Sequence, residues 1–204
     1  MTDPHPLEAV YEPLAVSVRK LIDVTIRTEA DAAAVLAARQ LIDAACQQLS
    51  VELMPGSFGL RTTPDGQGSA WGNVAIGIRN PVAPPLFVHH EPDGQVWTEF
   101  VLGAAYEGPA GHVHGGVCAL VLDHVLGATA HQPGRPAYTG TLTVRYLRGT
   151  RLGPLRAQAR VQRVEGVKTF AVGEITDGHG VTVQAEGVFI HPKQRPPLEA
   201  GPAA

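Results

Sequence analysis

Apolar and polar side chains alternate one by one along residues 155–162. The apolar residues are Leu155, Ala157, Ala159 and Val161, and the polar residues between them are Arg156, Gln158, Arg160 and Gln162. Because successive side chains of a β-strand point to opposite faces, this pattern predicts a strand with one buried and one solvent-facing side.

Four strand-like segments follow one another in the second half of the chain. They cover residues 137–148, 154–164, 167–176 and 181–190, after an earlier one at 96–105. Short turn sequences such as Glu165-Gly166 separate the last four. Short connections predict antiparallel neighbours, so we expect one antiparallel sheet whose apolar face must be covered.

Residues 116–130 provide the cover, because nearly every side chain there is apolar or small. A helix that is apolar all round is enclosed on all sides. The sequence therefore predicts an α+β fold in which a curled antiparallel sheet wraps one long central helix.

The N-terminal part has a different character. Residues 29–49 carry an apolar helical stripe that Thr28 can cap, residues 54–69 form a Gly- and Pro-rich loop, and the prolines of 80–85 predict an extended run. The predicted organisation is a helical extension with its loop (1–70), the main domain (71–191) and a disordered tail (192–204).

Composition removes several classes of function. The chain has 16 Lys and Arg residues and 19 Asp and Glu residues, with a pI near 6.3, so no basic surface for nucleic acid is expected. The most apolar stretch is too short to cross a bilayer, and the start of the chain lacks the features of a secretory signal. The distant pair Cys46 and Cys118 suggests neither a disulfide nor a zinc cluster, which favours a reducing cytoplasm.

Asp123 is the first candidate for chemistry, because an ionised carboxylate in the middle of an apolar helix costs several kcal/mol unless it is compensated. It could face a subunit interface, pair with an arginine, or act as an acid-base group. Cys118 on the same helix is more typical of a small core residue than of a nucleophile.

The segment His112-Val113-His114-Gly115-Gly116 precedes this helix. Glycines at a helix N-terminus make a tight turn, and they also let a substrate carbonyl approach free backbone N–H groups that can stabilise an oxyanion. Together with Asp123, the second interpretation is favoured. His112 and His114 resemble an HxH metal pair without a third ligand, so no metal and no organic cofactor are predicted.

Residues Gly111 to Gly127, GHVHGGVCALVLDHVLG, resemble the signature segment of the PaaI-like and THEM-type acyl-CoA thioesterases. Residues 139–148, TGTLTVRYLR, look like the strand that follows the central helix in that family. The likeness covers about residues 80–190. It implies the hot-dog fold, an acyl-CoA substrate and hydrolysis to a carboxylic acid and free coenzyme A.

The resemblance also implies roles for individual residues. Asp123 matches the family's catalytic acid, as general base or nucleophile, and the Gly116 amide matches the oxyanion donor beside the substrate-binding Gly115. Thr139 matches a hydroxyl that positions water, although strict alternation puts it on the face opposite Leu142.

The remaining motif residues keep two interpretations each. His114 either polarises the thioester carbonyl or, as we favour, holds the turn. Lys168 matches a family lysine near the thioester but is equally a solvated strand residue. Arg145 and Arg148 are candidates for binding the coenzyme A phosphates, or simply belong to the solvent-facing side of the sheet.

Two other functions are weighed against hydrolysis. A hot-dog hydratase for 2-enoyl thioesters would be expected to carry a histidine five residues after Asp123, where this chain has Ala128. A non-catalytic acyl-thioester binding module would keep the pocket and lose the acid, which is present here.

Helix arithmetic predicts the assembly. Gly116 and Asp123 share one face of the helix, but seven residues of rise separate them by roughly 10 Å. One thioester carbonyl cannot contact both, so the partner group must come from a second copy. We expect a homodimer, or a tetramer built from two dimers, in which Gly116 of one subunit faces Asp123 of the other.

Overall fold

The computed structural model describes residues 8–59, 61–62, 68–131 and 135–192. The chain divides into two compact units, one of residues 1–86 with 103–105 and one of residues 87–102 with 106–204. The predicted disordered tail lies outside the described residues, apart from Pro192. The predicted domain boundary at residue 70 stays a prediction.

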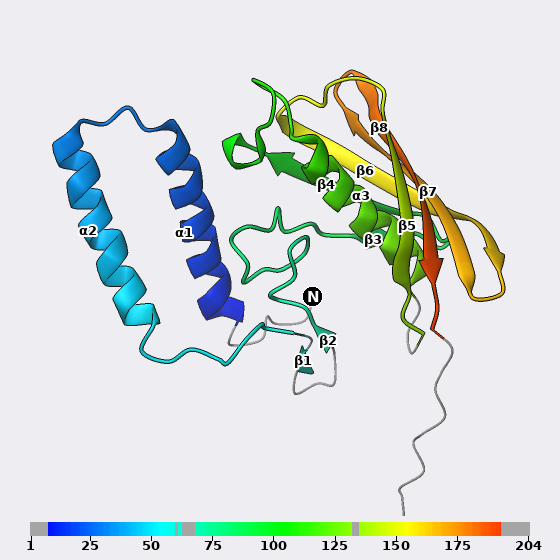
Figure 1. Cartoon of the computed structure of the whole chain (residues 1–204), viewed down its shortest axis with the longest axis horizontal. Helices are drawn as coiled ribbons and strands as arrows, with labels where there is room; N and C mark the ends of the chain where they lie inside the picture. Colours follow the sequence, from blue (N-terminus) through cyan, green and yellow to red (C-terminus); the bar gives the residue numbers. More distant parts are fainter. Residues whose placement is uncertain (1–7, 60, 63–67, 132–134, 193–204) are drawn as a thin grey trace, which may run out of the picture. The chain divides into compact units, whose positions relative to one another are not determined.

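The second unit is built on one six-stranded antiparallel sheet (Figure 1). Its strands are β3 (His89–His90), β4 (Val96–Leu102), β5 (Tyr138–Tyr146), β6 (Gly153–Glu165), β7 (Lys168–Asp177) and β8 (Gly180–Ile190), in the order β3-β4-β6-β7-β8-β5. All the strands expected from the pattern are therefore present, with ends that differ by a few residues.

Helix α3 (Gly115–Ala130) lies against one face of this sheet and forms the core with it (Figure 1). Val121, Leu122 and Val125 are completely buried. The helix sits close because the sheet has glycines beneath it: a Cβ on Gly173 would come within 2.6 Å of a Leu126 methyl carbon. The predicted hot-dog arrangement of sheet and central helix is confirmed.

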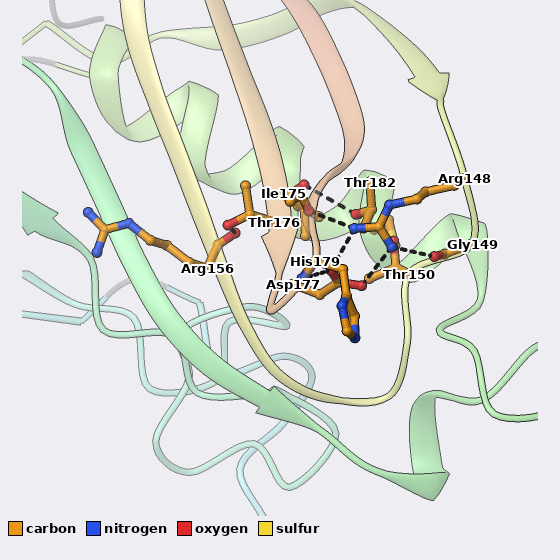
Figure 2. A network of polar contacts seen from close by, with 11 residues as sticks. Arg148, Gly149, Thr150, Arg156, Ile175, Thr176, Asp177, His179 and Thr182 are labelled. Atoms are coloured by element: carbon orange, nitrogen blue, oxygen red, sulfur yellow. Dashed lines mark hydrogen bonds and ion pairs between the residues drawn. The ribbon is translucent and has the colours of Figure 1, made fainter.

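A buried polar chain links the start of α3 to the sheet. The Thr150 hydroxyl donates to the Thr182 hydroxyl at 2.8 Å, and Thr182 donates to the Ile175 carbonyl at 3.2 Å (Figure 2). The Cys118 thiol lies 3.8 Å from the Thr150 hydroxyl. Burial raises the pKa of Cys118, so its thiol stays protonated at neutral pH and packs as a small core side chain.

The first unit contains α1 (Glu8–Arg27), α2 (Ala32–Leu49) and the short pair β1 (Arg61–Thr62) and β2 (Gly68–Ser69), and the 3-10 helix η1 (Ala104–Tyr106) begins in it. The Arg19 guanidinium secures the irregular segment 70–86 by donating to the Ala83 and Asn80 carbonyls, at 3.1 Å each. No residue of α2 is buried within the described structure.

No helix among the described residues is long and apolar enough to cross a membrane.

Three expectations for this unit need correction. Helix α2 begins later than predicted, and its N-cap is Asp31, whose carboxylate accepts from the Ala34 N–H at 2.8 Å; Thr28 instead accepts from the Ala30 N–H. Helix α1 was not expected. The run 80–85 is not extended throughout, because the Ala83 N–H donates to the Asn80 carbonyl and closes a turn.

Candidate active site

The turn before α3 is held by backbone hydrogen bonds on both sides. The His114 N–H donates to the Tyr106 carbonyl and the Val113 N–H to the Thr150 carbonyl, both at 2.9 Å. His114 is the N-cap, with extended backbone angles, and its Nδ1 accepts from the Gly116 N–H at 3.0 Å. In this geometry His114 holds the turn, which is the role the sequence favours.

The first four N–H groups of a helix have no carbonyl one turn earlier to bind. In α3 the Gly116 N–H binds the His114 ring, and the N–H groups of Val117 and Cys118 both reach the His114 carbonyl, at 2.9 and 3.3 Å. The Gly115 N–H has no hydrogen-bond partner among the described residues. It is the open donor at the positive end of the helix, where negative charge is stabilised.

Asp123 lies on α3 seven residues after Gly116, and its side chain is half-buried beside fully buried neighbours. The Thr139 hydroxyl donates to Asp123 Oδ1 at 2.8 Å. No arginine or lysine of the described residues pairs with this carboxylate, and its Oδ2 accepts no hydrogen bond from them. The carboxylate therefore has an oxygen with which it can accept a proton.

Thr139 reaches Asp123 because β5 contains a bulge. Thr139 lies opposite Phe189 and Thr141 opposite Val188, so Gly140 is one extra residue in the strand. The bulge changes the parity of the strand and puts Thr139 on the face of Leu142, toward α3. The expectation that Thr139 lies on the face opposite Leu142 is therefore wrong.

His124 follows Asp123 along the helix. Burial lowers its pKa, and the neighbouring Asp123 carboxylate offsets only part of this effect. The imidazole is therefore neutral at pH 7 and does not form an ion pair that would neutralise Asp123.

The three predicted cationic residues lie at different places on the sheet. The Arg148 guanidinium binds both carboxylate oxygens of Asp177, at 2.9 and 2.6 Å, and also donates to the Gly180 carbonyl (Figure 2). Arg145 pairs in register with Gln184 on the sheet face that points away from α3. Lys168 is exposed at the β6–β7 turn. The structure thus brings Thr139 to Asp123, but not these cations.

The Arg148–Asp177 pair predicts a pH-dependent contribution to stability. Hydrogen bonds from Arg148 lower the pKa of Asp177 well below its usual 3.8. A lowered carboxyl pKa stabilises the fold above the unfolded-state value, and this stabilisation disappears as the pH falls. Asp177→Asn should therefore be less stable than the wild type in urea at pH 7, with a smaller difference at about pH 3. Equal differences at both pH values would contradict this.

No group of three or more metal-ligating side chains among the described residues could hold a metal ion. The His112 ring lies 2.8 Å from the Ala110 carbonyl and the His114 ring caps α3, so both rings of the HxH pair contact backbone groups.

Tyr146 is a site residue that sequence reasoning missed. It ends β5 on the face toward α3, and its hydroxyl donates to the Gly115 carbonyl at 2.8 Å. Its place on the strand puts it on the same side as Val144, but only the packed fold shows that it reaches the turn.

Comparison with known proteins shows the family of the chain. The model of the thioesterase superfamily matches residues 110–184, from the turn before α3 into β8. A thioesterase superfamily protein of known crystal structure is 32% identical, with 89% of this chain and 95% of that chain covered and a TM-score of 0.75. The chain belongs to the thioesterase superfamily. The resemblance found in residues 111–127 is thereby confirmed.

More distant solved structures share the thioesterase superfamily fold. A putative thioesterase from Ralstonia eutropha, described as phenylacetic acid degradation-related, is 23% identical over 52% of this chain and 85% of its own, with a TM-score of 0.50. A Bacillus halodurans protein solved with CoA is 22% identical over 55% and 77%, and PaaI of E. coli is 17% identical over 54% and 81%, both with a TM-score of 0.50. No curated protein matches the chain.

Proposed function

We propose that the protein is an acyl-CoA thioesterase that releases a carboxylic acid and free coenzyme A. Membership of the thioesterase superfamily supports hydrolysis of acyl thioesters in general. The observation that carries the proposal is the half-buried Asp123 carboxylate, oriented by Thr139 at 2.8 Å, on a helix that begins with an open amide donor. The CoA bound to the Bacillus halodurans protein supports the choice of thiol.

The reaction needs a base and an oxyanion donor. Asp123 takes a proton from water as the water oxygen attacks the thioester carbonyl, and the C–S bond then breaks to release the thiolate, which regains the proton. Alternatively, the Asp123 carboxylate attacks the carbonyl itself and the C–S bond breaks to release the thiolate. Water then hydrolyses the resulting anhydride, which frees the carboxylic acid and Asp123, and the proton released from water protonates the thiolate. In both routes the carbonyl oxygen becomes negative and needs N–H donors.

We propose the N–H groups of Gly115 and Gly116 as those donors. The Gly115 N–H is open in the described structure. The Gly116 N–H donates to His114 Nδ1 at 3.0 Å, so its part in this proposal requires the His114 ring to turn away. For the phosphates of coenzyme A we propose Arg145 and Lys168, because neither side chain has a hydrogen-bond or ion-pair partner among the described residues. The Arg148 guanidinium, in contrast, is bound by Asp177.

We also propose that the active unit is a homodimer. The separation of roughly 10 Å between positions 116 and 123 of one helix is too large for a single carbonyl to bridge. The site of one chain is therefore incomplete, and a second copy supplies the donor that faces each Asp123.

A panel of acyl-CoA thioesters, followed by release of free thiol, tests the activity. Hydrolysis of none of them would overturn the proposal. The panel also determines the preferred acyl group.

Removal of the Thr139 hydroxyl tests the orientation of Asp123. Thr139→Val should lower kcat about tenfold, because one hydrogen bond that orients the carboxylate is lost, and Thr139→Ser should restore most of the rate. Thr141→Val is the matched control, since Thr141 lies on the other face of the same strand. Steady-state kinetics check this, and an unchanged kcat in Thr139→Val would argue against the assignment.

A further inference from the structure

Tyr146 makes two contacts with the glycine turn. Its hydroxyl donates to the Gly115 carbonyl at 2.8 Å. Its ring also lies against Gly115, because a Cβ at that position would come within 3.3 Å of two ring carbons and the hydroxyl. The last residue of β5 therefore contacts the first residue of α3 through both a polar and a van der Waals contact.

The hydrogen bond acts on the peptide unit that joins the two glycines. The Gly115 carbonyl and the Gly116 N–H belong to one planar group, so an anchored carbonyl also fixes the direction of the N–H. It restrains Gly115 as well, whose own N–H is the open donor of the turn. Glycine has more backbone freedom than any other residue, and the Tyr146 hydrogen bond to the carbonyl adds to the His114 cap on the N–H in restraining this peptide.

Polarisation adds to this geometric effect. A hydrogen bond accepted by a peptide carbonyl strengthens the N–H of the same peptide as a donor. Burial raises the pKa of Tyr146, so the phenol keeps its proton, and hence its donor, well above neutral pH.

We propose that Tyr146 is a positioning residue that holds the Gly115–Gly116 peptide in the direction required for stabilising the thioester oxyanion. This role rests on the proposed function. It acts through the backbone amides, which contact the reacting carbonyl, and Tyr146 itself does not.

The alternative role is purely structural, a contact that fastens β5 to α3. The two roles predict different results. A fastening contact contributes equally in the free enzyme, the substrate complex and the transition state, so its loss lowers stability and leaves kcat unchanged. A positioning contact matters most when charge develops on the carbonyl oxygen, so its loss lowers kcat and leaves KM nearly unchanged.

Tyr146→Phe is the test, because it keeps the ring against Gly115 and removes only the hydroxyl. We expect kcat to fall about three- to tenfold, with KM within about twofold of the wild type. The control is Tyr138→Phe, at the other end of β5, where the side chain is exposed on the face that points away from α3. It should retain the wild-type kcat and KM.

A spectroscopic measurement on the full chain accompanies the kinetics. In a ¹⁵N-labelled protein the Gly115 and Gly116 amide resonances should shift, and their hydrogen exchange should accelerate, in Tyr146→Phe but not in Tyr138→Phe. Thermal unfolding of both variants establishes whether any loss of rate follows from a loss of stability.

The outcomes separate this inference from the proposed function. A wild-type kcat in Tyr146→Phe, or a loss of rate that comes with a raised KM and lowered stability, would overturn the positioning role alone. Failure of the wild type to hydrolyse any acyl-CoA would overturn the proposed function, and the positioning role with it.

Discussion

Asp123→Asn is expected to lower kcat for acyl-CoA hydrolysis by about a hundredfold or more, while the protein folds normally. The amide keeps the shape of the carboxylate, and its oxygen can still accept the hydrogen bond from Thr139. It cannot take a proton from water or attack a carbonyl. Release of free thiol from the best substrate of the panel measures the effect.

The control for this variant is Glu186→Gln, which neutralises an exposed carboxylate on the face of β8 that points away from α3. It should leave kcat unchanged. Circular dichroism of both variants verifies the fold. A well-folded Asp123→Asn enzyme with the wild-type rate would remove Asp123 from the mechanism.

An isotope experiment on the wild type tests for a nucleophilic Asp123. In a single turnover in H₂¹⁸O, a general base places the label only in the carboxylic acid product. A nucleophilic Asp123 forms an anhydride, and attack of water on the Asp123 carbonyl would leave ¹⁸O in that side chain, which mass spectrometry of the peptide detects.

The elements of the second unit could be predicted because their signals are local. The alternation from Leu155 to Gln162 and the apolar run before Ala130 each reflect burial on one element at a time. Glycines and short polar turns then limited the connections to antiparallel ones. The observed strands differ from the predicted ones mainly at their ends, where backbone hydrogen bonds to neighbouring strands decide the boundary.

The orientation of Thr139 could not be predicted from alternation, because one extra residue reverses the parity of everything before it. Gly140 is the residue inserted, and a glycine inside a strand pattern is a recognised sign of a bulge. The pattern alone does not show whether such a glycine has a partner residue on the neighbouring strand or is an additional residue without one. That depends on the register with β8.

The hydrogen-bond partners of Tyr146 and Arg148 could not be predicted from the sequence either, because they lie far away along the chain. The contact of Tyr146 with Gly115 joins residues 31 positions apart and depends on how β5 ends beside α3. The ion pair between Arg148 and Asp177 depends in the same way on the position of the β7–β8 turn. In contrast, the His114 cap is local, and a histidine directly before two glycines at a helix start is where it can be expected.

Two inactive variants are expected to restore hydrolysis when they are combined in one dimer. The first is Asp123→Asn. The second is whichever of Gly115→Pro and Gly116→Pro is inactive alone, since proline removes the N–H yet is tolerated in the first turn of a helix. Losing one oxyanion donor should lower kcat by about a hundredfold or more, so each homodimer should be nearly inactive.

In the mixed dimer, the subunit with Asp123→Asn still has its glycine amides, and its partner still has Asp123. If the site forms between subunits, these groups meet at one of the two sites, while the other site lacks both. Co-expression with two affinity tags and tandem purification isolate this species, which should have about half the wild-type activity per dimer. If base and oxyanion donor came from the same chain, each site would lack one of them and the mixed dimer would stay inactive. That result, or a fully active monomer, would disprove the shared site.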